Sequence, residues 1–210
     1  MKKTLICAAL VAAGIATSVA QNVYSLNVVG YYNITIPANT WVMIANQLNT
    51  TNNTIGSLLT GMTGGETLQK YSGGFTAYIF DDADMAWTPD GNATLNPGEG
   101  AFFRSPTAKT LTFVGEVMQG SLTNTTPIGV YAIRSSMVPQ AGGVTSVLGL
   151  PGEGGDTVQT YAGGFTAYIF DDADMVWTPS EPNISVGQSF FIRKAPTSTQ
   201  NTWVRNFTVN

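Results

Sequence analysis

The feature that most constrains this chain is a long internal repeat. Residues 73–85 recur letter for letter as residues 163–175, an offset of 90 residues. Around them, residues 71–89 and 161–179 differ only by Ser72 against Ala162 and by Ala86 against Val176. Because identical residues favour identical local structure, we expect both copies to adopt the same fold.

The pattern in each copy predicts an all-β protein. Stretches rich in β-branched and aromatic residues alternate with turn residues at intervals of about 8–12 residues, as in a sandwich or barrel. We therefore predict two tandem homologous β-sandwich-like modules with short helical turns, residues 37–118 and 119–210, after an N-terminal strand segment at 21–36. Two independent domains and one packed unit are both compatible with this pattern.

Individual segments carry more specific expectations. Residues 75–80 form a strand with apolar side chains on both faces, so both faces are predicted to be covered. Helical turns are expected at 54–59 and 144–148, with Thr54 and Thr145 as caps. The segment 21–36 pairs either within its own chain or with the open sheet edge of a neighbouring subunit. The strand-like C-terminus is expected to be paired.

Residues 1–20 read as a cleaved secretory signal peptide. Lys2 and Lys3 precede an apolar run at 5–15 that is too short to span a bilayer, and residues 18–20 offer a small-x-small cleavage pattern. The alternative is a retained membrane anchor. We expect a secreted or cell-surface protein, extracellular or periplasmic, with no membrane span after the signal is removed.

Charge narrows the class of partner. Charged residues make up 10% of the chain, against about 25% in ordinary soluble domains. The net charge of −4 becomes −6 once Lys2 and Lys3 are removed. Such a chain has no basic surface for nucleic acid. Its low charge also weakens repulsion between copies and so makes self-association easier.

Residue types exclude several catalytic mechanisms. The chain has no histidine, and its one cysteine, Cys7, lies within the predicted signal peptide. Ser-His-Asp and Cys-His catalysis and His-ligated zinc are therefore excluded. No buried lysine stands out beside a serine, as Ser–Lys catalysis would need. We thus predict a protein that is not an enzyme.

A glycosidase is the least favoured alternative. It would need Glu99 with Glu116 or Asp90 as an acid pair, and the second copy has Gln188 where Glu99 stands. Arg104 and Arg193 recur after the Phe-Phe strands, and we expect each to pair with a nearby acid at a strand end.

The repeated segment also contains the sharpest candidate for a metal site. Its acidic residues cluster closely in both copies; they are Asp81, Asp82, Asp84, Asp171, Asp172 and Asp174. Calcium accepts six to eight oxygen ligands in irregular loops and would offset the repulsion between these carboxylates. The spacing is not that of an EF-hand. The alternative is a solvated hairpin in which Asp side chains accept hydrogen bonds from turn amides.

Four aromatic residues flank those acids. They are Tyr78, Trp87, Tyr168 and Trp177. Their rings are candidate platforms for the sugars of an extracellular glycan. The alternative is that they form core or cross-strand aromatic pairs.

Six segments together resemble a group of secreted bacterial proteins with duplicated β-modules. The segments are residues 27–31, 41–46, 78–87, 97–103, 113–117 and 136–140. They are spread over nearly all of the chain after the signal peptide. The resemblance implies export and an all-β fold, and it implies no activity or catalytic residue.

Two functions follow as hypotheses. The first is a secreted, non-catalytic structural or surface-assembly protein that associates with itself through strand edges. The second is an extracellular carbohydrate- or calcium-binding module that uses the two acidic and aromatic hairpins as equivalent sites.

Overall fold

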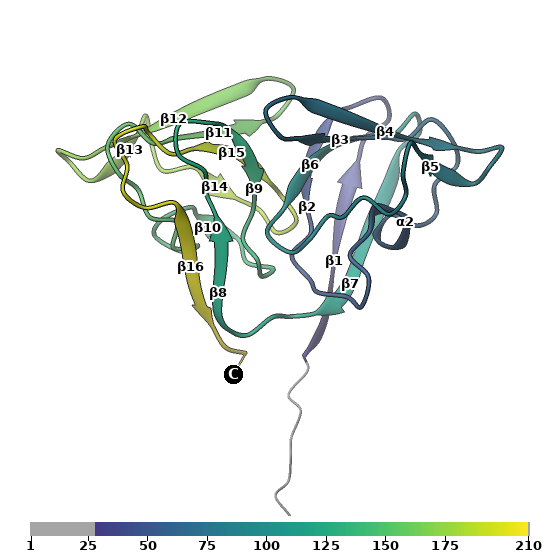
Figure 1. The fold of residues 1–210 in the computed structure, drawn as a ribbon, viewed down its shortest axis with the longest axis horizontal. Helices are drawn as coiled ribbons and strands as arrows, with labels where there is room; N and C mark the ends of the chain where they lie inside the picture. The colour runs from purple at the N-terminus through teal and green to yellow at the C-terminus, as the bar shows by residue number, and fades with distance from the viewer. Residues whose placement is uncertain (1–27, 210) are drawn as a thin grey trace, which may run out of the picture.

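The computed structural model describes residues 28–209, and they form an all-β fold, as the sequence predicts. Two five-stranded sheets dominate it (Figure 1). The first has the order β2–β6–β3–β4–β5, with bounds Val42–Ala45, Gly100–Arg104, Thr67–Tyr71, Phe75–Asp81 and Ala86–Thr88. The second has the order β9–β15–β11–β12–β13, with bounds Ala132–Arg134, Phe190–Arg193, Thr157–Tyr161, Phe165–Asp171 and Val176–Thr178. All neighbours within each sheet are antiparallel.

The repeated segment pairs in the same register in both sheets. Tyr71 lies opposite Phe75 in the first hairpin, and Tyr161 lies opposite Phe165 in the second. The short strands after the acidic turns also correspond, because β5 and β13 each place a tryptophan opposite a phenylalanine of the preceding strand. The identical residues therefore adopt the same hairpin twice.

Two further strand pairs cover the inner faces of these sheets. β1 (Val29–Ile36) pairs with β7 (Lys109–Glu116), and β8 (Gly120–Thr125) pairs with β16 (Thr202–Phe207). The described part of the N-terminal segment thus pairs within its own chain, and the C-terminal strand is paired as expected. A small pair, β10 (Gly142–Gly143) with β14 (Asn183–Ile184), completes the strands. The predicted signal peptide lies outside the described residues.

Of the two predicted helical turns, the first forms a regular helix. α2 (Ile55–Leu58) is a single turn, and the Thr54 side chain makes no capping hydrogen bond to it. At 144–148 the chain forms hydrogen-bonded turns and no regular helix, although the Val147 amide donates to the Gly143 carbonyl at 3.0 Å and the Gly149 amide to the Thr145 carbonyl at 3.1 Å, as in a helical turn. Glu181 accepts hydrogen bonds from the Thr145 and Ser146 amides at 2.7 Å each, which fixes this turn from another part of the chain.

Each large sheet buries its inner face against one of the two-stranded pairs. Below the first sheet, Tyr32 of β1 and Phe113 of β7 stack with ring centroids 5.1 Å apart, in a core shared with Leu68 of β3. Below the second, Trp203 of β16 packs against Phe190 of β15 at 6.1 Å. Each large sheet therefore packs on one two-stranded pair, and the core below the first sheet also includes Val138 from the second half.

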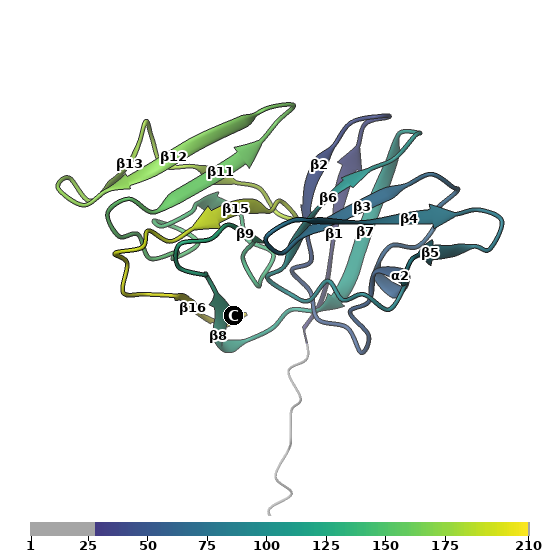
Figure 2. The same ribbon diagram turned by 45° about the horizontal axis from the view of Figure 1, so that its top comes forward.

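The two halves nevertheless form one unit, because backbone hydrogen bonds cross between them. The Ala45 amide donates to the Gly187 carbonyl at 2.8 Å, and the Ser135 amide donates to the Gly98 carbonyl at 2.9 Å. Ala45 corresponds to Ser135, and Gly98 corresponds to Gly187. Each half therefore supplies the donor of one bond and the acceptor of the other. An approximate two-fold axis therefore relates the halves, which extend as two wings from a central junction (Figures 1 and 2).

Close to this axis, one position requires glycine. A Cβ on Gly100 would lie 2.2 Å from the Cβ of Ser189 and 2.7 Å from Cγ2 of Ile133. Ser189 stands at the corresponding position of the other half. The strands β6 and β15 can approach this closely because only one of the two positions carries a side chain.

Candidate functional site

The outer faces of the two large sheets are covered only near the junction. There Met43, Phe102, Ile133 and Phe191 are buried in a shared cluster. Farther out, β4 and β12 leave their outer faces open. The prediction that both faces of the 75–80 strand are covered is therefore wrong, because this strand lies beyond the line where the sheets meet.

The open side chains form what we call the apolar face. Its large members are about half exposed: Phe75 by 52%, Ile79 by 49%, Phe165 by 55% and Ile169 by 52%. No charged residue stands among the outward-facing positions of β4 and β12 between these side chains, where Ala77 and Ala167 lie. Apolar side chains grouped in this way on a soluble protein are typical of contact surfaces.

Aromatic contacts join the two parts of the apolar face. Phe75 lies 5.9 Å from Phe102 and 6.3 Å from Phe191, between ring centroids. Phe165 lies 6.1 and 5.8 Å from the same two rings. The exposed phenylalanines of both wings thus rest on one shared aromatic layer, which makes the apolar face continuous across the junction.

Sheet edges offer less for association. The outer edge strands of the large sheets, β5 and β13, have three residues each and are followed by Pro89 and Pro179. Short edges next to proline resist strand addition. Among the described strands, β1 pairs with β7 alone, so its other side is a longer edge, with Tyr31 74% exposed on this strand.

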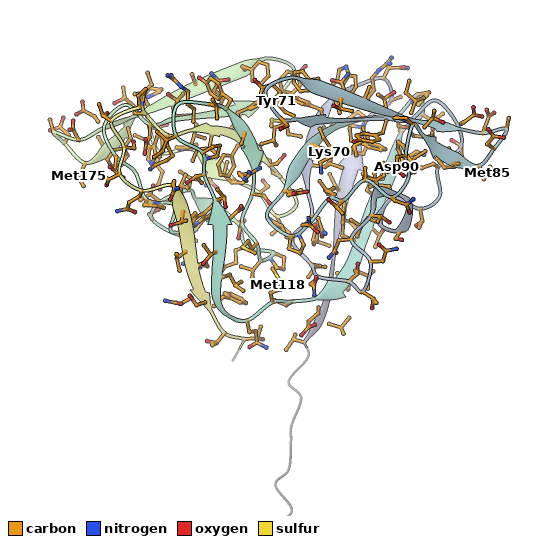
Figure 3. The ribbon with its side chains drawn as sticks, viewed as in Figure 1. Lys70, Tyr71, Met85, Asp90, Met118 and Met175 are labelled. Carbon is orange, nitrogen blue, oxygen red and sulfur yellow. The ribbon has the colours of Figure 1, made fainter. Side chains whose placement is uncertain are left out.

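The two acidic turns lie at opposite ends of the molecule, where Figure 3 labels Met85 and Met175. Asp81 accepts a hydrogen bond from the Ala83 amide at 2.8 Å, and Asp171 accepts one from the Ala173 amide at 2.9 Å. This is the geometry of the solvated-hairpin alternative. Among residues 28–209, no group of three or more His, Cys, Asp or Glu side chains could hold a metal ion.

Calcium binding by Asp81, Asp82, Asp84 and their counterparts stays a prediction. It requires that calcium raise the melting temperature and that Asp82→Asn with Asp172→Asn remove the rise. A melting temperature that is the same with calcium and with chelator would discard it.

The predicted aromatic platforms are partly inaccessible. Trp87 and Trp177 are buried, and they pack against Phe80 and Phe170 with centroids 5.5 and 5.3 Å apart. These contacts are the cross-strand pairs of the alternative interpretation. Trp177 also donates a hydrogen bond to Thr145 Oγ1 at 2.8 Å. Neither indole has an exposed face for a sugar, whereas Tyr78 and Tyr168 are half-buried.

The residues considered for acid catalysis do not meet. Glu99 accepts hydrogen bonds from Lys70 Nζ at 3.1 Å and from the Asn96 amide at 3.0 Å. The cleft that Glu99 lines contains neither Glu116 nor Asp90. Asp90 accepts a hydrogen bond from a neighbouring amide in its own loop.

The expected pairing of Arg104 and Arg193 with acids is wrong. Arg104 donates to Asn39 Oδ1 at 2.9 Å, and Arg193 donates to the Gly129 carbonyl at 3.3 Å. Both partners are neutral oxygens in corresponding loops, and within residues 28–209 neither arginine forms an ion pair. These two arginines fasten loops to strand ends.

Sequence reasoning missed a buried ionic network. Lys194 and Asp156 are both fully buried and form an ion pair, and Ser198 Oγ donates to the same carboxylate at 2.6 Å. The Ala195 and Glu153 amides donate to it as well, both at 2.8 Å. Ser198 is itself buried and its hydroxyl donates a hydrogen bond to Asp156, so this network holds together the loops that carry these residues.

The first half has a counterpart built from a different lysine. Glu66, at the position of Asp156, is fully buried and pairs with Lys109. Burial alone would raise the pKa of Glu66, but hydrogen bonds from Lys109 and from the Thr63 and Gly64 amides outweigh it and hold this pKa below its usual value. Glu66 and Asp156 occupy corresponding positions, but Lys109 and Lys194 do not. Comparison of the two copies therefore does not reveal either ion pair.

Within residues 28–209, no helix is long and apolar enough to cross a membrane. Comparisons with protein-family models, with curated proteins and with solved structures find no match for this chain.

Proposed function

We propose that this protein is a secreted, non-catalytic surface-assembly protein that contacts a second copy of itself through the apolar face. In this view the chain is a tandem duplication whose two sandwich modules form one rigid unit, delivered outside the cell by the signal peptide at residues 1–20. The observation that carries the proposal is the group of half-exposed side chains Phe75, Ile79, Phe165 and Ile169.

A second copy is the occupant that fits this surface best. The approximate two-fold axis makes the two parts of the face alike, so one copy turned over presents phenylalanine and isoleucine to the same residues of another. Between its four large side chains the face carries no charge, and the exposed Asp81 and Asp171 lie only at its outer ends. The chain's low charge weakens repulsion at longer range.

The available area agrees with a role as the centre of an interface. Four large side chains at half exposure offer roughly 400 Å². A standard interface buries about 800 Å² from each partner, with an apolar centre and a polar rim. The rows of Thr and Gln on the neighbouring strands β3 and β11 would supply part of that rim.

The test compares oligomeric state across face variants. We expect wild-type exported protein to gain mass with concentration in light scattering after size exclusion, and Phe75→Ser with Phe165→Ser to remain monomeric. Val204→Ser is the matched control, because Val204 is similarly exposed but lies on β16, away from the face. Each variant is first checked for an unchanged circular dichroism spectrum.

Other outcomes separate the alternatives. A wild-type protein that stays monomeric at all concentrations contradicts the proposal. Association that survives the face variants but is lost in Tyr31→Ser would instead assign it to the β1 edge. Monomers that are retained on immobilised glycans through Tyr78 and Tyr168 would favour the carbohydrate-binding alternative.

A further inference from the structure

A polar cleft lies between the two halves, separate from the centre of the apolar face. Its volume is about 540 Å³, and it is bounded by the β3–β4 hairpin on one side and by β9 with its preceding loop on the other. Figure 3 labels Lys70 and Tyr71, which lie beside the central junction. This volume is within the range of small-molecule sites.

Three charged side chains line this cleft. Glu99 accepts a hydrogen bond from Lys70 Nζ at 3.1 Å. The backbone of Glu99, just before β6, forms a β-bridge with Arg134 of β9. Arg134 donates from Nε to the Thr125 carbonyl at 2.7 Å and from Nη1 to the Ile133 carbonyl at 3.0 Å. These bonds fix the guanidinium, whose Nη2 makes no hydrogen bond within the described chain. Burial lowers the pKa of Arg134, and the charge of Glu99 opposes this shift.

The corresponding cleft wall of the other half is neutral. Residues Thr160, Gln188 and Ile44 stand where Lys70, Glu99 and Arg134 stand here. The halves meet equally well on that side, where Ile44 bridges to Gln188 just as Arg134 bridges to Glu99. The charges are therefore not required to join the halves.

Aromatic and hydroxyl groups complete the cleft. Tyr71, Tyr78 and Tyr131 line it together with Ser72 and Thr76. The Tyr78 hydroxyl makes no hydrogen bond within the described residues and is free to contact a ligand. Flat rings beside fixed polar groups are suited to a sugar, which presents an apolar ring face and a set of hydroxyls.

We propose that this cleft binds an acidic saccharide, a sugar bearing a carboxylate. Two cations against one anion leave a surplus positive charge in an otherwise acidic protein, and the fixed Arg134 offers the free donor that a carboxylate needs. Glu99 accepts a sugar hydroxyl, and Lys70 orients Glu99. The cleft adjoins the apolar face at Tyr71 and Tyr131, but its three charged residues lie outside that face, so this inference does not depend on self-association.

The test is isothermal titration calorimetry of the exported protein with trigalacturonate. Maltotriose serves as the neutral sugar and citrate as the carboxylate without a sugar ring. We expect trigalacturonate to bind, and maltotriose and citrate to bind at least tenfold more weakly. Arg134→Met should weaken trigalacturonate binding tenfold or more, and so should Lys70→Thr, which copies the residue of the other half.

Controls keep folding and binding apart. Thr160→Lys adds a charge on the neutral side and should leave affinity unchanged, and each variant is checked by thermal melting. Lys70 is a partly exposed ion-pair partner, so its loss should cost the fold little. No binding of trigalacturonate, equal binding of either other probe, or full affinity in folded Arg134→Met would each overturn the proposal. None of these results would bear on assembly through Phe75 and Phe165.

Discussion

Removing the amine of Lys194 should reveal how much the buried network stabilises the second half. In Lys194→Met the side chain keeps a similar length but loses its charge, and Asp156 remains fully buried without a counter-ion. Breaking a buried pair on one side costs about 3–5 kcal/mol. Asp156 would still accept three hydrogen bonds, at 2.6–2.8 Å from Ser198 and the Ala195 and Glu153 amides. We therefore expect a loss of about 3 kcal/mol, at the low end of that range.

Lys109→Met is the matched comparison in the first half. The Lys109 side chain is 13% exposed, so water can reach the Glu66 carboxylate once the amine is gone. Glu66 also keeps the hydrogen bonds from Thr63 and Gly64. We expect this variant to lose about 1–2 kcal/mol, as for a hydrogen bond to a charged group that solvent partly replaces.

The assay is urea unfolding monitored by tryptophan fluorescence, and thermal melting gives a second measurement of stability. For a chain of this size each kcal/mol shifts the melting temperature by about 2–4 °C, so Lys194→Met should melt about 6–12 °C lower. A loss below about 1 kcal/mol for Lys194→Met would refute the reasoning, because burial would then not govern the cost. A larger loss for Lys109→Met than for Lys194→Met would refute it as well.

Three further predictions test the junction and the two cores. Gly100→Ser should destabilise the protein by about 1–3 kcal/mol in urea unfolding. Adding Ser189→Gly should restore only part of this loss, because it relieves the contact with residue 189 but not the contact with Ile133. The pKa of Glu66 is depressed in the folded state, so ionised Glu66 stabilises the fold above the pKa of an unfolded glutamate, about 4.3. This stabilisation is lost as the pH falls through the lower folded pKa. In melting scans the melting temperature of Glu66→Gln should therefore fall less steeply with acid than that of wild type. Thr145→Val should cost about 1–2 kcal/mol in urea unfolding, because it leaves the buried Trp177 Nε1 without its acceptor.

The sequence was sufficient to predict the local fold but not what covers it. The repeat predicted the strand over 75–80 and its return through Trp87, since alternation and turn residues are local signals. Alternation could not show that Phe75 and Ile79 remain open, because that depends on where two sheets meet. The Lys194–Asp156 pair was likewise invisible, because it joins residues 38 apart that no motif connects.

The cleft shows the same limit. In the sequence Glu99 is only a weak candidate for acid catalysis, and Gln188 at the corresponding position argues against that role. In the structure that difference is informative, because it accompanies Lys70 and Arg134 on one wall. Only the approach of β9 to the first hairpin brings these three residues together.

The crossing hydrogen bonds at the junction have a consequence for how such a chain can change. If each half were a separate polypeptide, the same contacts would produce a homodimer, and every substitution would appear on both sides of its symmetry axis. Covalent linkage removes that constraint, so one wall can acquire Lys70, Glu99 and Arg134 while the opposite wall keeps neutral residues and preserves the joint. A single chain with two such halves can thus specialise one side without weakening the other.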